Sequence, residues 1–107
     1  MEKLSIKTVL KRINVLLAAK QYALLYAEDV GKRVESEEIE NAISEYGGDV
    51  VAPPEEAYDN IHIYQNNETD NEVATEMYLW INGKESDLTL SCDVGTDGKI
   101  MFFAIDK

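Results

Sequence analysis

The sequence is poor in the residues that form cross-links, metal sites and membrane spans. It has one cysteine, Cys92, one histidine, His62, and two prolines, which stand together at positions 53 and 54. A single cysteine excludes an internal disulfide framework and suits a reducing compartment. No apolar run approaches the roughly 18 residues of a membrane-spanning helix, and the short run at 13–19 lacks the cleavage site of a secretory signal. We therefore expect a cytoplasmic protein with no membrane partner.

Basic residues are also scarce, and their absence is local. The 107 residues include 10 Lys and Arg against 21 Asp and Glu, a net charge of -11, and no Lys or Arg lies between Val34 and Gly83. At average composition, about six basic residues are expected in a segment of that length. The segment instead holds thirteen carboxylates: Glu35, Glu37, Glu38, Glu40, Glu45, Asp49, Glu55, Glu56, Asp59, Glu68, Asp70, Glu72 and Glu76.

This acidity has two interpretations. It is either a solvated face that keeps the protein soluble, or a surface that speeds the capture of a basic protein partner. Both nucleic acid and anionic membranes carry the same sign of charge as the chain, so direct binding to nucleic acid is not expected.

Signals of catalysis or metal binding are weak. His62 has no Ser, Cys or Asp at a recognisable nucleophile spacing, and it is expected on the outward face of a strand. Cys92 alternates in register with Leu88, Leu90 and Val94, which predicts a buried thiol. Asp93 and Asp97 lack the spacing of a calcium loop. We expect a protein that is not an enzyme and holds no cofactor or metal.

The first 48 residues predict helices. Ile6, Leu10, Ile13 and Leu17 recur at spacings of three and four, which indicates a helix over about 5–19. A short helical segment is expected at 22–26, closed by Gly31. A further helix is expected over 36–46, with Ser36 as its N-cap and Gly47-Gly48 at its end.

From residue 58 onward the apolar period changes to two, which predicts strands at 61–64, 73–81, 87–94 and 99–106. In the last strand Ile100, Phe102 and Ala104 are expected on one face. The pairs at 66–67, 82–83 and 97–98 are turn signals. The predicted fold is a single α+β domain over 1–107, with two to three N-terminal helices in 1–48 packed on a four-stranded antiparallel meander in 58–107.

The outward face of this sheet is the best candidate for an interface. Tyr64, Tyr78 and Trp80 share its alternation with Glu76 and His62. Exposed aromatic residues rimmed by carboxylates are typical of an interface centre. The alternative is that a helix or the N-terminal segment covers this face.

Three motifs resemble those of a family of small, uncharacterised bacterial proteins: PPEEAY at 53–58, LW at 79–80 and SDLTL at 86–90. That resemblance implies no activity and no catalytic residues. In size, charge and type the chain is also similar to immunity proteins of bacterial toxin systems, including contact-dependent growth inhibition, where each cell makes a cytoplasmic inhibitor of its own toxin. The order of helices and sheet is similar to cystatin-like and nuclear-transport-factor-like folds.

Our first hypothesis is an immunity protein, a monomer or weak dimer, that neutralises a basic toxin such as an RNase by occlusion. Its expected partner-binding residues are Glu37, Glu38, Glu40, Glu45, Glu55, Glu56, Tyr58, Asp59, Glu76, Tyr78 and Trp80. A second hypothesis is a cystatin-like or transport-factor-like domain that binds a small molecule or acts as an enzyme. A third is an adaptor for a basic cellular protein.

Overall fold

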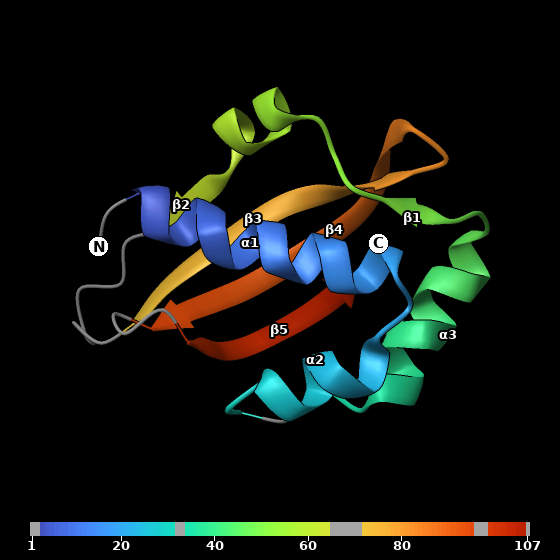
Figure 1. Ribbon diagram of the computed structural model, residues 1–107, viewed down its shortest axis with the longest axis horizontal. Coiled ribbons are helices and arrows are strands. Elements are labelled where there is room, and N and C mark those ends of the chain that lie inside the picture. The colour runs from blue at the N-terminus through green and yellow to red at the C-terminus, as the bar shows by residue number, and fades with distance from the viewer. Residues whose placement is uncertain (1–2, 32–33, 65–71, 96–98, 107) are drawn as a thin grey trace.

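The computed structural model describes residues 3–31, 34–64, 72–95 and 99–106. In chain order the elements are α1 (Lys3–Ala18), α2 (Tyr22–Glu28), α3 (Ser36–Tyr46), β1 (Val50–Val51), the 3₁₀ helix η1 (Glu55–Asn60), β2 (His62–Tyr64), β3 (Glu72–Ile81), β4 (Lys84–Gly95) and β5 (Ile100–Asp106). Helices precede an antiparallel sheet, so the predicted α+β class is confirmed (Figure 1). The predicted turns at 66–67 and 97–98 lie outside the described residues.

Helix α1 crosses one face of the sheet, in front of β3 and β4 (Figure 1). Its apolar stripe consists of Ile6, Leu10, Ile13 and Leu17, each no more than 1% exposed. Burial of a side chain of this size contributes about 1.5–3 kcal/mol to stability, so the stripe fixes which side of α1 meets the sheet. The predicted helix and its core face are confirmed.

Helices α2 and α3 lie where the apolar spacing predicts them, but the cap of α3 is different. The helix begins at Ser36 itself, and Glu35, with extended backbone, occupies the N-cap position without a side-chain cap bond. The carbonyl of Glu35 accepts a hydrogen bond from the Glu38 N–H at 3.0 Å. The prediction that Ser36 caps the helix is therefore wrong by one residue. Gly47 ends α3 with a φ of 89°, a conformation that favours glycine.

The four pairs of described strands are antiparallel, and the meander β2–β3–β4–β5 is confirmed. Outside the named strands, Asp29 forms an isolated parallel bridge with Ile100 of β5. The two-residue strand β1 adds to the meander by pairing with Ile81 and Trp80 at the end of β3, on the edge that β2 uses farther along. Two residues are too short to display an alternation, so β1 was not predicted. Asn82 and Gly83 form the predicted turn between β3 and β4 with φ values of 53° and 84°, as a tight hairpin requires.

A bulge between β3 and β4 explains part of the SDLTL motif. Tyr78 pairs with Thr89 and Trp80 pairs with Glu85, so three residues of β4 lie opposite Leu79. The Ser86 hydroxyl donates to the Leu79 carbonyl at 2.6 Å and accepts a hydrogen bond from the Leu88 N–H at 3.1 Å. The serine side chain therefore satisfies backbone groups that the interrupted ladder would leave unpaired.

A second irregularity changes the faces of β5. The register shifts between Asp93 and Val94, and Ile100, Phe103 and Ile105 are all buried. Strand β5 has one extra residue between the partners of Asp93 and Val94, and this residue reverses the alternation of side chains after it. The prediction that Ile100 shares a face with Phe102 and Ala104 is therefore wrong.

In Figure 1, α1 crosses in front of the sheet, and α2 and α3 are drawn beyond its β5 edge. The hydrophobic core contains residues of all three helices and of the sheet. Leu79, Leu90 and Phe103 from the sheet meet Leu25 of α2 and Ile39 of α3 in that core, and each is at most 1% exposed. Cys92 is buried in the same layer, as predicted. Among the described residues, no helix combines the length and apolar character needed to cross a bilayer.

Candidate functional site

The sheet face opposite the helices, here called the outer sheet face, carries the side chains that alternate with the core. They are His62, Tyr64, Ala74, Glu76, Tyr78, Trp80, Glu85, Asp87, Thr89, Ser91, Asp93, Ala104 and Asp106. None of these thirteen described positions is a lysine or arginine. Tyr64 is 45% exposed and Tyr78 is 52% exposed, so no described element covers them. The strand alternation predicted this arrangement correctly.

A hollow of about 310 Å³ lies on the outer sheet face. It is lined by Asn60, His62, Tyr64, Glu76, Met77, Tyr78 and Thr89. The register explains how these residues meet: His62 and Tyr78 belong to neighbouring positions of β2 and β3, with Glu76 directly opposite His62 and Thr89 directly opposite Tyr78. Cross-strand neighbours of this kind lie within side-chain reach of each other.

Glu76 is the polar centre of the hollow. The Tyr64 hydroxyl donates a hydrogen bond to one carboxylate oxygen, and Ser91 Oγ donates to the other at 3.3 Å. The bond to Glu76 raises the pKa of Tyr64, because the carboxylate opposes loss of the phenolic proton. The ring of His62 lies against that of Tyr64, with centroids 4.3 Å apart. The carboxylate is therefore held in place beside aromatic surfaces.

Trp80 lies on the outer sheet face but is only partly exposed. It pairs with Val51 of β1, and its indole Nε1 is buried without a hydrogen-bond partner among the described residues. Trp80 is therefore partly a packing residue of this end of the sheet, whereas Tyr78 presents its ring to solvent. Sequence alternation alone gives both residues the same face and does not separate these roles.

Tyr58 was predicted as a partner-binding residue, but its side chain is buried within the fold and is not accessible to a partner. It is 3% exposed, because the 3₁₀ turn of η1 directs its ring toward α1. Its hydroxyl oxygen accepts a hydrogen bond from Asn14 Nδ2 at 3.4 Å, and burial raises its pKa. The packing of Tyr58 instead anchors η1 to the helical layer.

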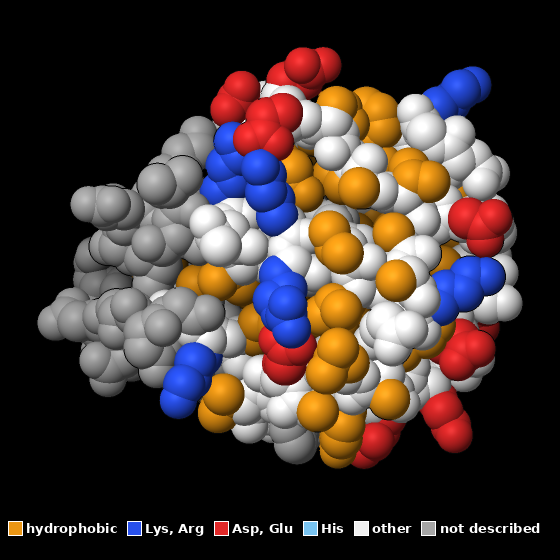
Figure 2. All heavy atoms as spheres, viewed as in Figure 1, with side chains coloured by type: hydrophobic (Ala, Val, Ile, Leu, Met, Phe, Trp, Pro, Cys, Tyr) orange, Lys and Arg blue, Asp and Glu red, His pale blue; other side chains and the backbone are white. Residues whose placement is uncertain are grey.

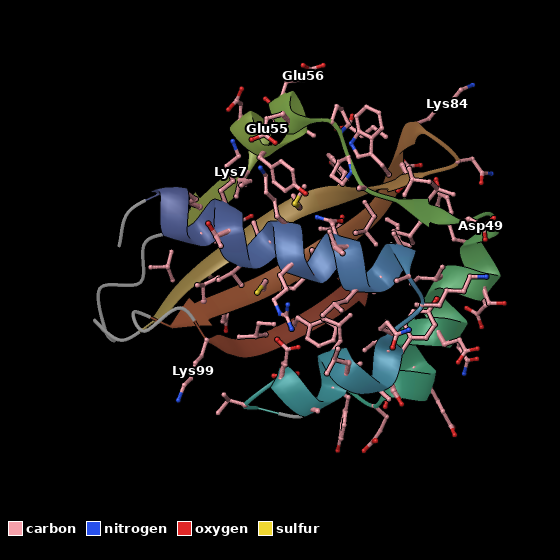
Figure 3. The ribbon with its side chains drawn as sticks, in the orientation of Figure 1. Lys7, Asp49, Glu55, Glu56, Lys84 and Lys99 are labelled. Carbon is pink, nitrogen blue, oxygen red and sulfur yellow. The ribbon has the colours of Figure 1, made fainter. Side chains whose placement is uncertain are left out.

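The carboxylates of η1 differ in their surroundings (Figure 3). Glu55 pairs with Lys7 Nζ at 2.6 Å and with Lys11 Nζ at 2.7 Å, and hydrogen bonds from Lys11 and Lys7 lower its pKa. Its charge is already compensated within the chain, so it is a poor candidate for attracting a partner. Glu56 and Asp59 are exposed.

Helix α3 forms a separate acidic surface. Glu37, Glu38, Glu40 and Glu45 are all exposed and have no ion pair among the described residues. Salt bridges from Lys7 and Lys11 to Glu55 place η1 against the first half of α1. Asp49 lies beside the C-terminal end of α1, where its carboxylate is 3.7 Å from Lys20 Nζ. Because η1 and α3 lie at different places around α1, their acidic residues form separate surfaces (Figure 1).

Carboxylates that the sequence reasoning did not select accompany the aromatic residues of the outer sheet face. Glu85, Asp87 and Asp106 are exposed there, opposite or beside Trp80 and Thr89. The signal was present in the alternation of β4, which places Asp87 on the same face as Thr89. On the helix-covered side the space-filling view shows apolar side chains mixed with both signs of charge (Figure 2).

The comparisons with known proteins identify a family but no activity. Neither a curated protein nor a solved structure matches the chain. A family model described as a domain of unknown function, DUF7668, matches residues 15–107, which include η1, the whole sheet and the hollow. The chain therefore belongs to the DUF7668 family.

Proposed function

We propose that this chain is an immunity-type protein that binds a basic protein toxin, such as an RNase, in the cytoplasm and neutralises it by covering its surface. The outer sheet face supports this proposal, because exposed aromatic residues and carboxylates occur there together without a lysine or arginine at its described positions. Nucleases bind phosphates with Lys and Arg, so the two surfaces are complementary in charge.

In this proposal the exposed aromatic rings and the exposed carboxylates of the outer sheet face have different roles. Tyr64 and Tyr78 offer large, rigid rings that lose little conformational entropy on binding. Glu85, Asp87 and Asp106 are exposed on the same face, toward its Tyr78 and Trp80 end, and attract a basic partner during encounter. Neutralisation in this proposal is by binding alone, by a chain that is a monomer or weak dimer.

The structure bears differently on the other two hypotheses. A small-molecule domain of cystatin-like or transport-factor-like type needs a cavity on the helix-covered face, but Leu10, Ile13 and Leu17 of α1 fill that face. An adaptor for a basic cellular protein would use the same outer sheet face, so the identity of the partner separates it from an immunity protein.

The test is co-expression of the chain with the toxin domain encoded beside its gene. We expect wild-type chain to restore growth, and Tyr78→Ala to weaken the purified complex by about thirtyfold, which is the typical cost of losing an interface anchor. Val15→Ala, an exposed change on α1, is the control and should leave affinity unchanged. Protection that survives Tyr78→Ala with full affinity would place the interface elsewhere, and an absence of any neighbouring toxin that binds would refute the immunity function.

A further inference from the structure

Glu76 is a partly buried carboxylate of the outer sheet face that is held on both of its oxygens. Tyr64 Oη and Ser91 Oγ each donate a hydrogen bond to it. No described lysine or arginine pairs with it, and the segment 65–71 between β2 and β3 contains neither residue type. Its negative charge is therefore positioned but not compensated by a cation of the described chain.

The walls around this carboxylate suit a flat cation. The rings of Tyr64 and Tyr78 are both about half exposed, and His62 lies against Tyr64 at a centroid distance of 4.3 Å. Aromatic faces attract a cation placed above them, and the effect adds to pairing with a carboxylate. The hollow of about 310 Å³ gives such a group room to enter from solvent.

We propose that this hollow receives an arginine side chain of the partner, with the guanidinium paired to Glu76 and stacked on the exposed tyrosine rings. The inference rests on the proposed function, which supplies a basic protein as the partner. Arginine fits better than lysine because its planar guanidinium can donate two parallel hydrogen bonds to one carboxylate while stacking on an aromatic ring. An ammonium group is a compact, strongly hydrated charge and gains less from the rings.

The site can be tested without the partner. The probe is N-acetyl-arginine methylamide, followed by ¹H–¹⁵N chemical shifts of the intact chain. N-acetyl-citrulline methylamide, which has nearly the same shape but no charge, and the corresponding lysine compound are the matched ligands. We expect saturable shifts at residues lining the hollow with the arginine compound, weaker ones with lysine and none with citrulline.

Substitutions then distinguish a specific role of the Glu76 carboxylate from a general effect of the negative charge on the outer sheet face. Glu76→Gln should raise the dissociation constant of the arginine probe about tenfold or more, since a charge-assisted hydrogen bond is lost. Glu85→Gln removes the same charge from the same face outside the hollow and should leave the constant within about twofold. Tyr78→Phe should retain binding, whereas Tyr78→Ala should lose it.

The outcomes distinguish this inference from the proposed function. Equal shifts with the citrulline compound, shifts centred on α3, or full binding by Glu76→Gln would overturn the arginine site. If the arginine site fails but Tyr78→Ala still disrupts a toxin complex, the interface stands and only its occupant is wrong. If the probe binds as expected but no toxin partner exists, the arginine site stands and the immunity function is wrong.

Discussion

Arg12 of α1 holds Glu28 of α2 through two parallel hydrogen bonds, from Nε to Oε1 and from Nη2 to Oε2, both 2.8 Å long. This pair joins α1 to α2, a helix of seven residues. The hydrogen bond from Arg12 lowers the pKa of Glu28 below its usual value of 4.5. A carboxyl group with a lowered folded-state pKa stabilises the fold above its unfolded pKa and loses that contribution as the pH falls through the folded value.

Glu28→Gln should therefore lower the melting temperature at pH 7 by no more than about 4 °C, because the Arg12 side chain is 57% exposed and that of Glu28 is 29% exposed, so solvent screens the pair. The difference from wild type should shrink at acid pH, because the carboxyl becomes protonated in both states as the pH falls through the lowered folded-state pKa of Glu28. Thermal unfolding at neutral and at acid pH measures it. In an Arg12→Ala background, where the pair is already absent, Glu28→Gln should show no such pH-dependent difference.

Ser86→Ala tests the bulge between β3 and β4. The substitution leaves the Leu79 carbonyl and the Leu88 N–H without the hydroxyl that both use, and Ser86 is buried. We expect a loss of about 1–3 kcal/mol in the free energy of unfolding, measured by urea denaturation. Ser44→Ala at an exposed position of α3 is the control. Wild-type stability of Ser86→Ala would show that water replaces the hydroxyl.

The helices and the main hairpin could be predicted because each depends on local signals. The spacing of Ile6, Leu10 and Ile13 fixes one buried side of a helix, and Asn82-Gly83 adopts the positive φ values that a tight hairpin needs. The same logic identified the outer sheet face, since period-two alternation from 73 to 81 admits one assignment of faces once the apolar side is buried.

What could not be predicted depends on departures from a regular period. A bulge reverses the faces of β5 after Ile100, and no residue type there marks it. Tyr58 turns inward because η1 is a 3₁₀ helix fixed by contacts with α1, which are distant in sequence. The hollow around Glu76 similarly requires the β2–β3–β4 register, which brings together Tyr64 and Ser91 from separate strands.

The buried thiol of Cys92 should be nearly inert. Burial, with a smaller effect of Asp93, raises its pKa from 9.0 to about 12, so at pH 8 the thiolate is about a thousandfold rarer than in an unperturbed cysteine. We expect Ellman's reagent to label the native protein at least about a hundredfold more slowly than the urea-unfolded protein. Cys92→Ser should also destabilise the fold by about 1–3 kcal/mol, because it buries a hydroxyl in the core. Rapid native labelling would contradict the buried position.

Charge neutralisation can locate the surface that steers the partner. Changing Glu85, Asp87 and Asp106 together to their amides should slow association with the toxin about tenfold at low salt, and added salt should reduce the difference. The matched triple change of Glu37, Glu38 and Glu40 removes the same charge from α3 and should slow association by less than about threefold. Stopped-flow fluorescence measures both rates. The reverse order would assign steering to α3.

Tyr78 and Trp80 are two residues apart on one strand, yet their substitutions should have opposite consequences. Tyr78 is 52% exposed, so Tyr78→Ala should change the free energy of unfolding by less than about 0.5 kcal/mol while weakening the partner complex. Trp80 is partly buried against β1, so Trp80→Ala should cost about 2 kcal/mol of stability, below the 3–5 kcal/mol typical of a fully buried aromatic residue. Urea denaturation of both variants, beside affinity measured well below their melting temperatures, separates the two effects. A Trp80→Ala protein of wild-type stability would mean that β1 does not pack on the indole, and a destabilised Tyr78→Ala protein would mean that the exposed ring supports the fold rather than an interface.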